Sequence, residues 1–192
     1  MSGLNKQISE LGVGSQLTLD DIPNIDLYMD QVIQLFENQF SGTKRNEQDK
    51  VLTKTMINNY AKGKLLFPIK NKKYSKQHLI LISLIYQLKG ALSINDIKDL
   101  LEKLNEKTDE GEFDLETFYT SYLHLSQKNG ERFIEDSQIR EREAKEEIKL
   151  LKDKNSAYLE RALLISSFVD ISNLYRRAAE KLLDGMVSEK EH

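Results

Sequence analysis

Residues 52–66 of the chain read LTKTMINNYAKGKLL, and this stretch decides the fold class. Thr53 is a good N-cap and Gly63 is a good C′ residue, so the stretch predicts one short helix with a defined start and end. In a helical projection one face is apolar, whereas the opposite face and its flanks are small, polar and cationic. These outer side chains are Lys54, Thr55, Asn58, Asn59 and Lys62. They have the chemistry to reach base edges and phosphates in a major groove, although an ordinary surface helix gives the same pattern.

The next stretch, residues 67–78, reads FPIKNKKYSKQH and predicts a basic hairpin followed by a helix. Pro68 is an edge or turn residue, so a small two-stranded wing near residues 66–74 is predicted, with its tip at residues 70–73. The lysines at this tip are Lys70, Lys72 and Lys73. Lysines at a hairpin tip can contact phosphates, but they also protect an exposed strand edge.

Apolar periodicity on both sides of this segment predicts further helices. A repeat of three and four residues indicates an amphipathic helix over residues 24–40. Residues 75–89 are apolar nearly all round, which predicts a buried central helix. Ser93, with an acid three residues later, begins another helix that ends near residue 104. Residues 17–105 are therefore expected to form an N-terminal domain.

The C-terminal region, residues 112–185, is expected to be helical throughout. Asn129 and Gly130 are predicted to separate a first helix, residues 114–127, from a long one. The last part of the long helix carries apolar residues in steps of four and three, a heptad-like seam. The seam consists of Leu164, Phe168, Ile171, Tyr175 and Leu182. It is predicted to be a dimer interface, with packing inside the chain as the alternative.

Composition restricts the classes of function. The chain has no Cys and three widely spaced His, so neither a disulfide nor a metal site is expected, and no cofactor is indicated. No apolar run reaches membrane-spanning length and no signal peptide is recognised, so a cytoplasmic protein without membrane contact is expected. No motif places a nucleophile beside a base or a metal ligand, which argues against an enzyme. Residues 1–16 and 186–192 are expected to be flexible tails.

The charge is distributed unevenly along the chain. Residues 44–89 hold eleven Lys or Arg and two acids, a net charge of +9, whereas the other residues hold 17 basic and 29 acidic side chains, a net charge of −12. One basic region on an acidic chain is typical of nucleic-acid binding, but a solvated face has the same appearance. Lys44 and Arg45, in the polar loop over residues 41–50, belong to this basic region.

The order of these parts resembles the DNA-binding domain of the MerR-type winged-helix regulators over about residues 17–104. The matching positions are an aromatic helix end, a Gly-x-Leu-Leu run, a proline, and a basic wing that ends in Tyr-Ser, namely Tyr60, Gly63, Leu65, Leu66, Pro68, Lys73, Tyr74 and Ser75. The chain departs from the family at Asn58, where a basic residue is usual, and in its longer 41–50 loop. The whole sequence also resembles a family of uncharacterised bacterial proteins with a domain of unknown function.

The resemblance implies a mostly α protein, with an N-terminal winged helix-turn-helix domain, a small two-stranded β wing and a long-helix C-terminal region. It implies a sequence-specific transcriptional regulator that binds double-stranded DNA as a homodimer. The groove-facing residues would be Thr55, Asn58, Asn59 and Lys62, and the phosphate contacts would be Lys44, Arg45, Lys54, Lys70, Lys72 and Lys73. An effector ligand is left open, because the C-terminal half matches no known effector domain. The alternative is a non-enzymatic helical adaptor that binds a protein partner.

Overall fold

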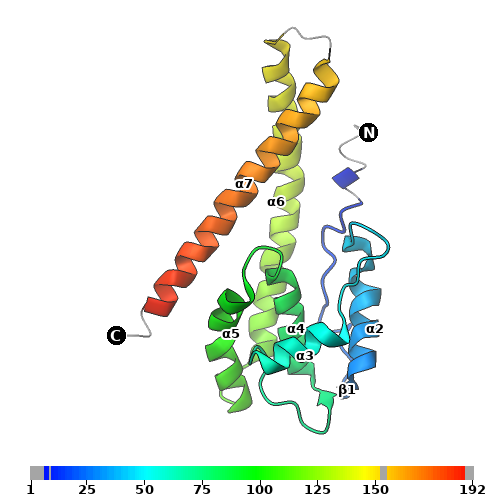
Figure 1. Ribbon diagram of the computed structural model, residues 1–192, viewed down its shortest axis with the longest axis vertical. Helices are drawn as coiled ribbons and strands as arrows, with labels where there is room; N and C mark the ends of the chain where they lie inside the picture. Colours follow the sequence, from blue (N-terminus) through cyan, green and yellow to red (C-terminus); the bar gives the residue numbers. More distant parts are fainter. Residues whose placement is uncertain (1–6, 9, 152–154, 189–192) are drawn as a thin grey trace. The chain divides into compact units, whose positions relative to one another are not determined.

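The computed structural model describes residues 7–8, 10–151 and 155–188 of the chain. The protein is mostly helical and has a small two-stranded antiparallel sheet, as predicted (Figure 1). It divides into two compact units, Ser9–Ser126 and Gln127–His192 with Met1–Ile8. The predicted N-terminal domain, residues 17–105, lies within the first unit. In order, the elements are β1 (Leu27–Tyr28), α2 (Met29–Phe40), a 3-10 turn (Ser41–Thr43), α3 (Lys54–Lys62), β2 (Lys73–Tyr74), α4 (Lys76–Leu88), α5 (Ile94–Asp109), α6 (Leu115–Lys149) and α7 (Ser156–Ser188).

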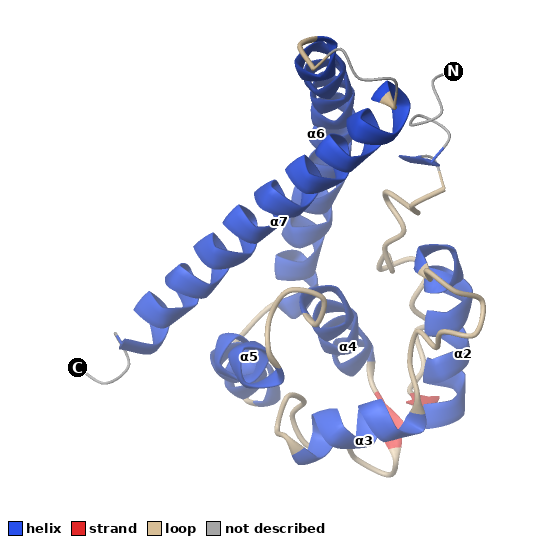
Figure 2. Ribbon diagram, turned by 45° about the horizontal axis from the view of Figure 1, so that its top comes forward, coloured by secondary structure: helices blue, strands red, loops and turns tan. Residues whose placement is uncertain are grey.

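Helix α4 forms the centre of the first unit, as its apolar sequence predicts. Every residue from His78 to Ile85 is buried. Figure 2 shows α2, α3 and α5 arranged around this helix. Each contributes fully buried side chains to the same core, among them Phe36, Ile57 and Ile97. The core therefore fixes which face of each surrounding helix is turned toward solvent.

The two-stranded sheet is not the predicted hairpin. β2 pairs with β1, which precedes α2, and the register places Leu27 opposite Tyr74 and Tyr28 opposite Lys73. Residues 66–69, expected to be the first wing strand, form a loop. Pro68 has no N–H to donate to a strand ladder, and the partly buried residues around it pack against the core instead. The segment predicted to be a wing therefore consists of a loop followed by the strand β2, and β2 pairs with β1, which precedes α2.

Helix α2 begins later than its periodicity predicts. Its N-cap is Tyr28, whose backbone N–H donates to the Gln31 side chain at 2.8 Å. Residues 27 and 28 are extended because they pair with β2. Ile25, one of the apolar residues at the start of the predicted 24–40 helix, is 67% exposed. Tertiary strand pairing therefore overrides the helical pattern in the first part of the predicted 24–40 helix.

The C-terminal region contains two long helices, but the break between them differs from the prediction. Helix α6 continues through Asn129 and Gly130 without interruption and ends at Lys149. A single glycine inside a helix costs only about 1 kcal/mol, which long flanking helical segments can offset. The i,i+4 pair of Arg140 with Asp136, at 2.5 Å, supports the helix beyond this glycine. Helix α7 extends to Ser188, into the segment expected to be a flexible tail.

Candidate nucleic-acid interface

The outer face of α3 carries every side chain that the sequence placed there. Thr53 caps the helix, since its hydroxyl accepts the Met56 N–H at 3.2 Å. Ile57 and Tyr60 are buried on the inner side, which fixes the rotation of the helix. The exposed residues share one face, and α3 itself contributes no acidic side chain to it: Lys54, Thr55, Asn58, Asn59 and Lys62. This face can offer hydroxyl, amide and ammonium groups together to an anionic or hydrogen-bonding partner.

Helix α3 ends with a left-handed residue at Lys64. The N–H of Leu65 donates to the Tyr60 carbonyl at 2.9 Å, and the N–H of Lys64 donates to the Ala61 carbonyl at 3.2 Å. These two bonds form a Schellman motif, whose C′ residue is usually glycine. Here that residue is Lys64, with φ of 58°. An exposed lysine that the sequence prediction overlooked therefore lies just beyond the helix.

Gly63, which the sequence placed at the left-handed position, is needed for a different reason. Its φ is −75°, a conformation open to any residue. A Cβ atom at Gly63 would lie 2.8 Å from Leu65 Cδ1 and 3.0 Å from the Asn59 carbonyl oxygen. Close approach, rather than backbone conformation, therefore explains this glycine.

The predicted wing tip is a tight turn. The N–H of Lys73 donates to the Lys70 carbonyl at 3.0 Å, and the central residues Asn71 and Lys72 have φ of 52° and 58°. Two positive φ values occur in type I′ turns, in which Asn and Gly are preferred. Lys70 and Lys72 are exposed, whereas Lys73 is half-buried with Nζ 5.1 Å from the centre of the Tyr28 ring. Figures 1 and 2 both show α3 and the loop that carries this turn at the same end of the unit.

His78 fixes the base of the wing loop. Its Nδ1 accepts the Ser75 N–H at 3.1 Å, so Nε2 carries the proton and donates to the Phe67 carbonyl at 3.2 Å. The imidazole also lies against the Phe67 ring, with centroids 3.9 Å apart. Burial lowers the pKa of His78, which favours the neutral ring that these bonds require. The His78 side chain thus bonds to both ends of the loop between Phe67 and Ser75.

The remaining predicted phosphate contacts have different surroundings. Lys44 is only 16% exposed and pairs with Glu37 at 2.5 Å. The hydrogen bond from Lys44 is the main reason why the pKa of Glu37 is lowered. Lys44 therefore secures its own loop, and its charge is already neutralised. Lys54 pairs with Asp30 at 2.7 Å, but both side chains are largely exposed, and such a pair is weak enough to exchange for a phosphate. Arg45 is exposed.

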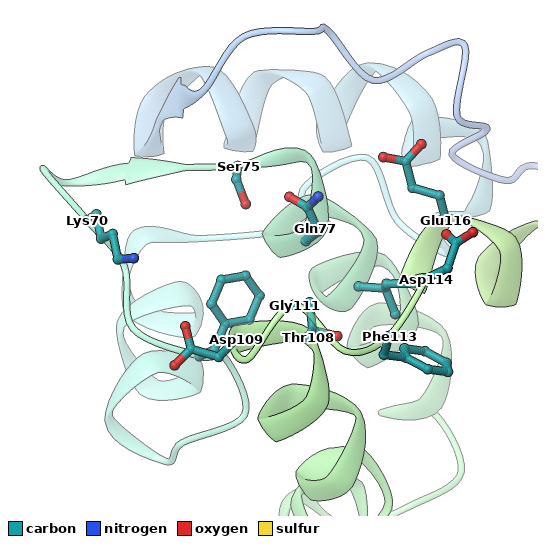
Figure 3. A pocket seen from close by; sticks show the side chains of 11 residues that line it. Lys70, Ser75, Gln77, Thr108, Asp109, Gly111, Phe113, Asp114 and Glu116 are labelled. Atoms are coloured by element: carbon teal, nitrogen blue, oxygen red, sulfur yellow. The ribbon is translucent and has the colours of Figure 1, made fainter.

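A cavity of about 350 Å³ adjoins the wing turn. Figure 3 shows Lys70 and Asp109 at one side of it and Asp114 and Glu116 at the other. Two of its four charged groups already serve the fold: Asp114 accepts the N–H and hydroxyl of Thr117, which lowers the pKa of Asp114, and Glu116 pairs with Lys76 at 2.8 Å. The cavity places negative charge beside Lys70 and so limits the basic surface on that side.

The predicted dimer seam is divided between two environments. Its first three residues, Leu164, Phe168 and Ile171, are buried or half-buried. Phe168 lies against Phe133 of α6, with ring centroids 6.3 Å apart, so this part packs within the chain. The last two residues, Tyr175 and Leu182, are 71% and 73% exposed. Tyr175 and Leu182 are therefore the two seam residues that are largely exposed in the described structure.

Neither a metal site nor a membrane span is found in the described part of the chain. Among the described residues, no three His, Asp or Glu side chains come together as a metal site would require. None of the helices in residues 7–8, 10–151 and 155–188 is both long enough and apolar enough to cross a membrane.

A family model for DUF1836, a domain of unknown function, matches residues 17–122, more than half of the chain. The match covers the sheet, α2 to α5 and the start of α6. No curated protein and no solved structure matches the chain. The chain therefore belongs to the DUF1836 family.

Proposed function

We propose that this protein is a sequence-specific DNA-binding transcriptional regulator that acts as a homodimer and has a winged-helix mode of docking. The observation that carries the proposal is the outer face of α3. It presents Thr55, Asn58 and Asn59 between Lys54 and Lys62, all exposed and without an acidic residue among them. Amide side chains form bidentate hydrogen bonds to adenine, and lysines neutralise phosphates, so the face combines the two kinds of contact that groove recognition needs.

The wing turn supports the same proposal. Glycine adopts a φ of 58° without strain, yet the turn has Lys72 at such a position. The strained position therefore carries a positive charge at the tip, next to the exposed Lys70. Such a pair at the same end of the unit as α3 is suited to the phosphates that flank a groove.

The test is the salt dependence of DNA binding. Sites are first selected from a random DNA pool, and affinity is then measured by fluorescence anisotropy over a range of salt concentrations. Removing one lysine–phosphate pair should reduce the log–log slope by roughly 0.9. Replacing Lys70 and Lys72 by Ala should therefore reduce it by roughly 2. A matched control replaces Lys103 and Lys107, two exposed lysines of α5, and should leave the slope nearly unchanged.

Base recognition requires a separate variant. Asn58→Ala should weaken the selected sequence by about 1–3 kcal/mol relative to other sequences, because the amide can no longer bond to a base edge. An equal decrease in affinity for every sequence would assign Asn58 to the backbone. Failure of the wild-type protein to enrich any sequence from the pool would refute the proposal and favour an adaptor that binds a protein.

A further inference from the structure

A stripe on one face of α7, formed by Ile171, Tyr175, Ala178, Ala179, Leu182 and Met186, has a mirror-symmetric spacing. Counted from the midpoint between Ala178 and Ala179, the apolar residues occur at equal distances in both directions along the chain. Tyr175 and Leu182 are each three residues beyond the nearer alanine, and Ile171 and Met186 are each seven residues beyond it. In a helix of 3.6 residues per turn these positions share one face about 100° wide. The stripe therefore has the same order of positions from either end.

We propose that this stripe packs antiparallel on the same stripe of a second copy of the chain. In a two-fold interface, residue i contacts residue j of the other copy and j contacts i in return. The symmetric spacing provides this correspondence directly: Tyr175 meets Leu182, Ile171 meets Met186, and the two alanines meet at the axis. A parallel pair would instead place each residue against its own copy and would gain nothing from the symmetry.

Most of the stripe is exposed within its own unit and is therefore available to a second copy of the chain. Tyr175 and Leu182 are 71% and 73% exposed, Met186 is 47% exposed, and both alanines are exposed, whereas Ile171 at one end of the stripe is half-buried. Large apolar side chains that share one helix face mark an interaction site more often than isolated ones do. The small alanines at the centre allow the two helix axes to approach closely.

The charges of α7 fit a second copy better than a charged partner. The helix carries four acidic and four basic side chains, so two copies neither repel nor attract each other at long range. Arg176, next to the stripe, pairs with Glu180 of its own helix at 2.6 Å. Closing the interface therefore leaves neither of these charges without a partner.

The size of the stripe sets the expected strength of association. Its exposed side chains offer roughly 400 Å² per copy, about half of the ~800 Å² per partner in a standard interface. A reversible dimer with a dissociation constant in the micromolar range is expected. DNA with two half-sites would strengthen it, because the second contact becomes intramolecular.

The first experiment is sedimentation of the full chain without DNA, from low to high micromolar concentration. Wild-type protein should change from monomer to dimer over this range. Tyr175→Glu and Leu182→Glu should each raise the dissociation constant at least tenfold. Both side chains are exposed in the single chain, so neither variant should disturb folding. Val169→Glu is the matched control, because Val169 is 55% exposed on another face of the same helix. This variant should associate as the wild-type protein does.

The second experiment determines the orientation of the two helices. The protein has no Cys, so any disulfide that forms must join the introduced thiols. Under mild oxidation, Ala179→Cys and the double variant Tyr175→Cys/Leu182→Cys should form disulfide-linked dimers, because these positions meet across an antiparallel pair. Tyr175→Cys alone should not, since it lies far from its own copy.

The outcomes distinguish this inference from the proposed function. The inference rests on the homodimer of that proposal, but neither experiment contains DNA. A wild-type protein that stays monomeric at high micromolar concentration would overturn the inference and leave DNA binding as a separate question. Efficient cross-linking by Tyr175→Cys alone would overturn the antiparallel arrangement. A dimer with the expected cross-links that binds no DNA would refute only the proposed function.

Discussion

Replacing Lys64 by Gly should stabilise the protein while removing a positive charge from the end of α3. Lys64 holds a φ of 58° and donates the second bond of the Schellman motif, to Ala61 at 3.2 Å. A left-handed conformation costs a residue with a Cβ about 1–2 kcal/mol. Glycine avoids that cost but loses about 0.5–1 kcal/mol through greater freedom in the unfolded chain. The expected net gain in the free energy of unfolding is about 0.5–1 kcal/mol.

The assay is urea denaturation followed by far-UV circular dichroism, with two matched variants. Lys64→Ala removes the same charge but keeps the Cβ, so it should be about as stable as the wild type. Lys62→Gly, two residues earlier inside α3, should cost about 1 kcal/mol, because glycine is unfavourable within a helix. The reasoning is refuted if Lys64→Gly is no more stable than Lys64→Ala.

Three other predictions concern the wing and the core. Lys72→Gly should also stabilise the fold, by about 0.5–1 kcal/mol in the same assay, and should reduce the salt slope of DNA binding by roughly 0.9. Burial lowers the pKa of His78 below its ordinary value near 6.5, so the unfolded chain takes up its proton first. The free energy of unfolding should therefore decrease as the pH is lowered from about 6.5 to the folded pKa of His78. In titrations between pH 8 and 5.5, His78→Gln should abolish this decrease. The Tyr119 hydroxyl donates a hydrogen bond to the Leu17 carbonyl at 2.6 Å and bonds to the Ser83 hydroxyl at 2.8 Å. Tyr119→Phe should therefore lower the free energy of unfolding by about 1–3 kcal/mol in urea denaturation. An unchanged stability would contradict this hydrogen-bonding role.

Features set by local sequence were predictable. Thr53 at the start of α3 and Ser93 at the start of α5 accept the N–H groups that their positions required. The apolar character of residues 75–89 correctly indicated the central helix α4. The outward face of α3 followed from periodicity alone, because Ile57 and Tyr60 could only be inward.

Features set by distant contacts were not predictable. Tyr74 gave no sign that its strand partner would be Leu27, which lies on the other side of α2 and α3 in the sequence. The wing lysines look alike in sequence, yet Lys73 lies against Tyr28 while Lys72 is exposed. Similarly, nothing local distinguishes Lys44, paired with Glu37, from the exposed Arg45 beside it. The side chains meet partners that only the folded chain brings close.

The pairing of β1 with β2 has a consequence for how insertions should affect this family's chains. Four residues close a loop that contains α2, the polar segment after it, and α3. The chain entropy of closing a flexible loop grows only with the logarithm of its length, by about 0.6 kcal/mol for each doubling. Homologues can therefore lengthen the exposed segment between α2 and α3 at little thermodynamic expense. A one-residue slip in the register of Leu27 with Tyr74 would instead turn the side chain of the strand that slips from the core to solvent, so length variation should occur in the loop and not in the strands.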